Sequence, residues 1–216
     1  MKLSEKTISV LKNFSAINPN LMVKAGTHQR TIDRDKVILA EATLEDSFPS
    51  DFGIYDLNQF LSNLSVFENP DISFKDNHLE IVEGNFKLHY FYCSPNHIKL
   101  PPDKSLDIPS PDAEFHLTYN SLQKLLKIAS LNNLPTLTVY GESGGLYVKT
   151  HEKNNSSSNY ASSRLDDYSG KDFEVTFKIE SLKIIPDSYN VKINVAGFAI
   201  FANSNNTIKY FIALDK

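Results

Sequence analysis

The sequence repeats one structural pattern four times. A short amphipathic helix is followed by strands in which apolar and polar residues alternate, and this unit recurs at roughly 50-residue intervals. Such a repeat constrains the fold strongly, because every copy must pack in a similar way. We therefore predict an α+β fold with two similar domains, each built from two helix-plus-antiparallel-strand repeats. The four helices are expected at Ser4–Phe14, Tyr55–Leu64, Thr118–Leu126 and Lys178–Ile185.

A proline-rich segment separates the second repeat from the third. Residues 94–112 contain five prolines and show neither helical nor strand periodicity, which is typical of an extended connector. The predicted organisation is an N-terminal domain over residues 1–93, the connector over 94–112 and a C-terminal domain over 113–216.

The composition narrows the class of protein. The chain has 216 residues, and 41% of them are hydrophobic, which is ordinary for a globular protein. Cys93 is the single cysteine, so no disulfide can form within the chain, and we expect a buried, inert thiol. No apolar run has the length of a signal core or a membrane span, which favours a cytoplasmic protein. The net charge of −4 argues against a general nucleic-acid coat, which is normally basic.

Motifs that suggest catalysis or metal binding have simpler explanations. Gly141–Gly145 matches the G-x-S-x-G pattern of a hydrolase nucleophile elbow, but a strand at Leu146–Thr150 follows where that motif requires a helix. A hairpin turn explains the glycines better. No two of the six histidines have the i, i+4 spacing of a helical metal site. We predict no catalytic residue, no metal ligand and no cofactor. The histidines are His28, His78, His89, His97, His116 and His151.

The lysines suggest a binding surface. On three of the four predicted helices, lysine occupies the face away from the apolar stripe. On one helix this pattern indicates only a solvated face. Its repetition predicts a common basic surface on an acidic protein, suited to contact with a phosphate backbone without reading of bases. The candidate DNA-facing residues are Lys2, Lys6, Lys12, Lys124, Lys127, Lys178 and Lys183.

In the order of its motifs, the chain resembles the DNA sliding clamps, or polymerase processivity factors, of T-even-like tailed phages. The similarity covers nearly the whole chain and rests on short segments in a fixed order. They are Met1–Ser4, Leu11–Phe14, Ile54–Asn58, Leu122–Leu126 and Tyr210–Leu214.

This resemblance implies a homotrimeric ring of two-domain subunits that encircles duplex DNA without sequence specificity. Helices would line the hole, and sheets would pair across subunit interfaces through edge strands, for which Leu79–Val82 and Leu146–Thr150 are the candidates. It also implies an ATP-driven clamp loader, a replicative polymerase tethered by its C-terminal peptide, a role in late transcription and location in the cytoplasm of an infected bacterial host. For the peptide pocket beside the connector we select Ile98, Leu100 and Ile108.

Two other functions remain open at this stage. Tandem β-rich domains with Asn- and Ser-rich loops also suit a structural phage protein of the tail or baseplate. An enzyme would require hydrolysis that depends on Ser143. The second predicted helix, Tyr55–Leu64, contains no lysine, so its contribution to a DNA-facing surface would be polar rather than charged.

Overall fold

The computed structural model describes residues 1–104, 106–155 and 157–215. Position 105 of the predicted connector and the last residue of the second predicted domain therefore lie outside the described residues. The chain forms two compact units, Met1–Asp103 and Lys104–Lys216, and their boundary falls within the segment 94–112.

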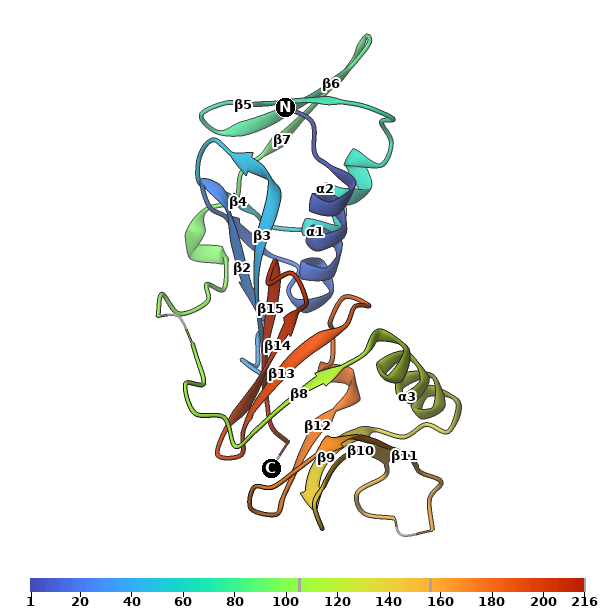
Figure 1. The fold of residues 1–216 in the computed structure, drawn as a ribbon. Helices are drawn as coiled ribbons and strands as arrows, with labels where there is room; N and C mark the ends of the chain where they lie inside the picture. Colours follow the sequence, from blue (N-terminus) through green and yellow to red (C-terminus); the bar gives the residue numbers. More distant parts are fainter. Residues whose placement is uncertain (105, 156, 216) are drawn as a thin grey trace. The chain divides into compact units, whose positions relative to one another are not determined.

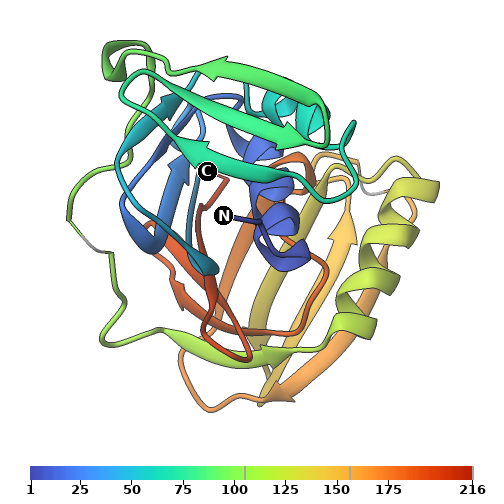
Figure 2. The same ribbon diagram turned by 90° about the horizontal axis from the view of Figure 1, so that it is seen from above.

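The first unit combines two helices with antiparallel strands (Figure 1). Strand β1 pairs with β4, β2 with β3, and β5, β6 and β7 form a three-stranded sheet in that order. Helix α1 packs against β3 and α2, as Figures 1 and 2 show. The elements are α1 (Glu5–Ile17), β1 (Leu21–Val23), β2 (Gly26–Ile32), β3 (Ile38–Phe48), β4 (Phe52–Ile54), α2 (Leu57–Leu64), β5 (Asp71–Phe74), β6 (His78–Glu83), β7 (Phe86–Phe91) and the 3-10 turn η1 (Pro95–His97).

The second unit contains one α-helix and two sets of antiparallel strands. One set has the order β15-β14-β13-β8 and the other the order β11-β10-β9-β12, and α3 packs on β10 and β11. The elements are β8 (Ala113–Leu117), α3 (Tyr119–Leu131), β9 (Thr136–Glu142), β10 (Gly145–His151), β11 (Ala161–Asp167), β12 (Phe173–Lys178), the 3-10 turn η2 (Ile179–Ser181), β13 (Tyr189–Asn194), β14 (Phe198–Asn203) and β15 (Ile208–Ala213).

The helices begin where the sequence supplies a capping side chain. Ser4 Oγ accepts the N–H of Thr7 at 3.1 Å ahead of α1, and Thr118 Oγ1 accepts the N–H of Ser121 at 3.2 Å ahead of α3. Each bond satisfies a donor that has no partner within the helix. Buried Leu11 and Phe14 then hold α1 in the core of its unit.

The G-x-S-x-G segment forms a hairpin turn, as predicted. Strand β9 runs into β10 through this turn, with Glu142 opposite Gly145. Ser143 has φ +50° and Gly144 φ +82°, the left-handed conformations of a tight turn between paired strands. Strand β10, not a helix, directly follows the turn at Ser143, so the nucleophile elbow is excluded.

The predicted fourth helix is wrong. A single 3-10 turn, η2, occupies Ile179–Ser181, and no helix covers 182–185. The N–H of Ile185 instead donates to Tyr210 Oη at 3.1 Å, and its carbonyl accepts the Tyr189 hydroxyl. Pro186 disfavours helical backbone at the residue before it, and β-branched Ile184 and Ile185 add to that bias.

The predicted interface strands are also wrong. Leu79–Val82 lies in β6, between β5 and β7, and Leu146–Thr150 lies in β10, between β9 and β11. Both strands are hydrogen-bonded on both sides, so neither can pair with another subunit.

Strands β7 and β11 are edges of these two sheets instead. At the opposite edges, chain termini already form hydrogen bonds: Met1 exchanges two backbone hydrogen bonds with Ile72 of β5, and the Asp215 N–H donates to Thr176 O of β12 at 2.7 Å. Within the described chain, no strand pairs with the outer side of β7 or β11. Each of these two sheets therefore presents one edge at which another strand could add.

Candidate nucleic-acid interface

The lysines near the N-terminus are exposed, but they differ in their partners. Helix α1 buries Thr7, Leu11 and Phe14, so the opposite side of the helix carries Lys12. Lys2 and Lys12 both line a hollow of about 230 Å³ that residues of α1, α2 and the segment 67–70 surround. Neither lysine lies within ion-pair distance of a carboxylate of the described residues.

Lys6 forms an ion pair with a carboxylate of β3. Its Nζ donates to Glu45 Oε1 at 2.5 Å, although 80% of the lysine side chain is exposed. The hydrogen bond and the charge of Glu45 raise the pKa of Lys6, and the hydrogen bond from Lys6 lowers the pKa of Glu45. Lys6 therefore remains charged, but the negative charge of Glu45 weakens its attraction for an anionic ligand.

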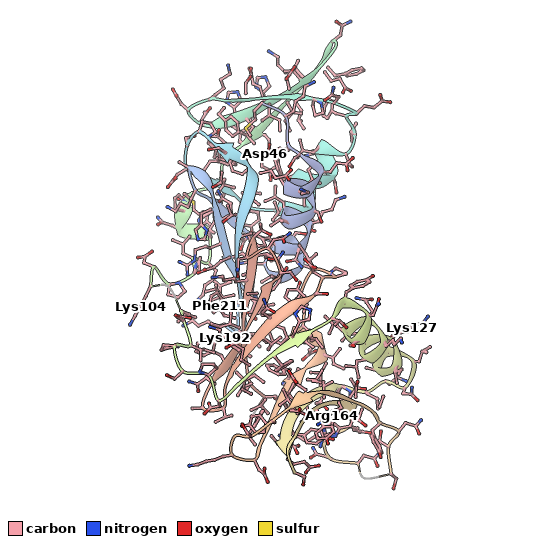
Figure 3. All side chains as sticks on the ribbon, viewed as in Figure 1. Asp46, Lys104, Lys127, Arg164, Lys192 and Phe211 are labelled. Atoms are coloured by element: carbon pink, nitrogen blue, oxygen red, sulfur yellow. The ribbon has the colours of Figure 1, made fainter. Side chains whose placement is uncertain are left out.

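Helix α3 carries the clearest basic pair. Leu122, Leu125 and Ala129 are buried beneath it, and Lys124 and Lys127 are exposed on the outward side. Figure 3 shows Lys127 directed away from the strands of its unit. In the described chain, no carboxylate is within 4.0 Å of either ammonium group. Both ammonium groups are therefore exposed and are not paired with a described carboxylate, so they are available for contact with phosphate.

The two remaining lysines lie at η2 and not on an α-helix. Lys178 ends β12, and its Nζ is 3.8 Å from Asp215 Oδ1. It lines a hollow of about 650 Å³ together with Lys153, Glu180 and Asp215, so the surroundings are of mixed charge. Lys183 is exposed after η2. Lys153, which was not among the predicted DNA-facing residues, comes near Lys178 only through the fold of the loop after β10.

The three predicted pocket residues differ in accessibility. Ile98 is 7% exposed and packs over Gly53, where an added Cβ would lie only 2.7 Å from Ile98 Cδ1. Ile108 is 1% exposed, whereas Leu100 is 48% exposed. Leu100 is thus the one of the three that can meet a partner without local rearrangement.

Exposed apolar side chains lie on or beside both free sheet edges. On β7, Phe86 is 76% and Phe91 64% exposed. Beside β11, Leu131 of the packed helix α3 is 74% exposed and Tyr160, just before the strand, 70%. Exposed apolar groups beside unpaired strands are typical of an interface. The alternation of apolar residues does not show which strand ends a sheet, so these residues were not predicted from the sequence.

Cys93 differs from its prediction. The residue is half-buried, and its Sγ lies 4.0 Å from Nδ1 of His97, so a basic group is close to the thiol after all. No helix among the described residues combines the length and apolar character needed to cross a membrane.

Comparisons with known proteins agree on one family. Residues 2–92 match the family model described as DNA polymerase processivity factor. The sliding clamp of Vibrio phage KVP40 is 32% identical over 222 residues, which cover 100% of this chain and 99% of that protein. The sliding clamp of Escherichia phage RB69 is 28% identical over 223 residues, covering 100% and 97%.

The fold recurs at lower sequence identity. The crystal structure of the proliferating cellular nuclear antigen from Entamoeba histolytica has a TM-score of 0.70 and 15% identity to this chain, covering 100% of it and 98% of that chain. At this identity the likeness establishes the fold alone.

Proposed function

Because the chain belongs to the sliding-clamp family of DNA polymerase processivity factors, we propose that it works as a closed ring of three identical subunits around duplex DNA. Sliding clamps confer processivity on a polymerase and are not enzymes. Membership of this family argues against the two alternative functions that the sequence left open, a structural tail or baseplate protein and a hydrolase. A ring holds DNA by topology, so its inner surface needs only weak, mobile contacts to phosphates.

The observation that carries this proposal is the pair of free edges. Strand β7 has a free edge that carries Phe86 and Phe91, and β11 has a free edge beside Leu131 and Tyr160. The two edges thus present different side chains. Pairing of β7 in one subunit with β11 of the next is a heterologous contact, and such contacts close into rings when the rotation allows. The new strand pair would shield exposed apolar side chains of both edges, which are Phe86 and Phe91 on one side and Leu131 and Tyr160 on the other.

For the DNA-facing surface we propose the exposed lysines, with unequal weights. Lys12, Lys124 and Lys127 have no described carboxylate partner and contribute most. Lys2 and Lys183 are exposed and add to them. The charges of Lys6 and Lys178 are partly offset by Glu45 and Asp215. This surface would attract the backbone without reading sequence.

We propose that a C-terminal peptide of the replicative polymerase docks beside the connector, with Leu100 as its accessible apolar contact, and that an ATP-driven clamp loader places the ring on DNA. The resemblance to clamps of T-even-like phages extends the proposal to late transcription, in the cytoplasm of the infected host.

The decisive test is native mass over a wide range of concentration, followed by polymerase stimulation on primed circular DNA. We expect a trimer, whether or not it dissociates on dilution, and longer products with the cognate polymerase and loader. A chain that is monomeric at every concentration would remove the topological mechanism.

Removing the partner of Lys6 tests the assignment of the DNA surface. In Glu45→Gln, Lys6 keeps its charge and loses its carboxylate, so the loaded ring should resist salt better. The measurement is the lifetime of the clamp on circular DNA as NaCl increases. Asp51→Asn is the matched control, because Asp51 pairs with exposed Lys24 at 2.8 Å, outside the lysine set. Equal effects of the two substitutions would show that only net charge matters.

A further inference from the structure

Two histidines and a glutamate gather on one face of the β5-β6-β7 sheet. His78 and Glu80 are two residues apart on β6, so their side chains share a face. His89 of β7 is directly opposite Glu80 in the strand register. Leu79 and Ile81, on the other face of β6, are fully buried, which directs the three polar side chains away from the core.

The three side chains converge on one point. Oε1 of Glu80 lies 4.0 Å from Nε2 of His78 and 3.7 Å from Nε2 of His89, and the three possible ligand atoms all lie within 4.8 Å of one another. Donor atoms around a tetrahedral zinc ion are about 3.3 Å apart, given metal–ligand bonds near 2.0–2.1 Å. Rotation of side chains alone can close that difference.

His78 has the hydrogen bonding of a metal ligand. Its Nδ1 lies 2.7 Å from Oδ1 of Asn77, an acceptor, so Nδ1 carries the hydrogen. The lone pair of the neutral ring is then on Nε2, which is shielded from solvent and has no hydrogen-bond partner. Metal-bound histidines typically donate the other ring N–H in this way, and an unsatisfied buried nitrogen requires an explanation.

We propose that His78, Glu80 and His89 bind a divalent transition-metal ion of the zinc type, with water in the fourth position. Two imidazoles and one carboxylate form a donor set that suits zinc. The imidazole rings are stacked, with centroids 4.7 Å apart and planes at 12°, so both must tilt toward the ion. His89 has a 44% exposed side chain, and the χ2 torsion of histidine is soft, which permits that movement.

Two lysines compete with the ion for Glu80. Lys87 Nζ is 3.6 Å from Oε1, the oxygen that faces both histidines, and Lys75 Nζ is 3.5 Å from Oε2. Binding displaces Lys87 from Oε1 and leaves Lys75 beside the outer oxygen. Lys87→Ala should therefore tighten zinc binding, because a cation that opposes the ion has been removed.

The test uses the full chain, stripped with a chelator and titrated with Zn²⁺ by calorimetry. One ion should bind per chain. His78→Ala and His89→Ala should each weaken binding by at least about tenfold, and Asn77→Ala, which frees the His78 ring, by about tenfold. Amide exchange should also slow in β7 when zinc is added, because the ion links β7 to β6.

Two controls separate this site from other zinc-binding groups. His28→Ala removes an exposed histidine elsewhere and should change nothing. Cys93→Ser removes the thiol near His97, a second pair of groups that could take zinc, and should leave the affinity unchanged. The proposal is overturned if the wild-type chain binds no zinc, or if binding survives in His89→Ala and disappears in Cys93→Ser.

Discussion

Replacing Lys12, Lys124 and Lys127 together by glutamate will leave the subunit folded and trimeric but will reduce processive synthesis at least about tenfold. All three side chains are exposed and point away from buried helix faces, so the core does not change. Each substitution removes a positive charge and adds a negative one, which moves the net charge from −4 to −10 per subunit. Because each phosphate contact contributes a slope of roughly 0.9 in the dependence of log affinity on log salt, the loss should grow as NaCl increases.

The measurement is product length on primed circular DNA at several NaCl concentrations, with native mass as a check on the ring. The matched control reverses Lys24, Lys171 and Lys209, which are exposed outside the α-helices and give the same net charge. It should retain most of the processivity. If the helix variant supports full processive synthesis, or if both variants fail equally, the assignment of the DNA-facing surface is wrong.

Local signals in the sequence predicted most helices and strands. The helices predicted from Ser4 and from Thr118 begin one residue after those positions, and the glycines before Leu146 form the predicted hairpin. Such features depend on a few neighbouring residues, so a single sequence contains the information. The helix predicted at Lys178–Ile185 failed for a different reason. The hydroxyls of Tyr189 and Tyr210, which come later in the chain, hold the backbone of Ile185 in another conformation.

Features that depend on strand neighbours were not predictable. Leu79–Val82 and Leu146–Thr150 have the apolar alternation of interface candidates, yet both are central strands. The pairing of Met1 with β5 and of Asp215 with β12 determines which edges remain free, and no local pattern encodes it. The proposed zinc site was missed for the same reason. His89 faces Glu80 through strand register and not through the helical spacing on which the prediction of no metal ligand relied.

Mixing two interface variants should yield a dimer that neither forms alone. Phe91→Asp places a charge on the β7 edge and leaves the β11 side intact, whereas Leu131→Asp does the reverse. Both side chains are more than half exposed in the subunit, so the fold should tolerate either change. In a ring each charge would be buried in an apolar contact, which costs on the order of 2–4 kcal/mol per interface and weakens association about 30- to 1,000-fold.

Each variant alone should therefore be a monomer at concentrations where the wild-type chain is a trimer. Together, the intact β7 edge of Leu131→Asp can pair with the intact β11 side of Phe91→Asp, and growth must stop there because the outer surfaces of that pair are both damaged. Native mass spectrometry of a 1:1 mixture, with one variant isotopically labelled, should show a mixed dimer and no trimer. A contact that joins identical surfaces would give no rescue, because each partner would need the same intact patch. Leu100→Asp, which changes an exposed apolar residue outside β7, β11 and α3, should remain trimeric alone. The mixed dimer thus identifies a head-to-tail interface, on which ring closure depends.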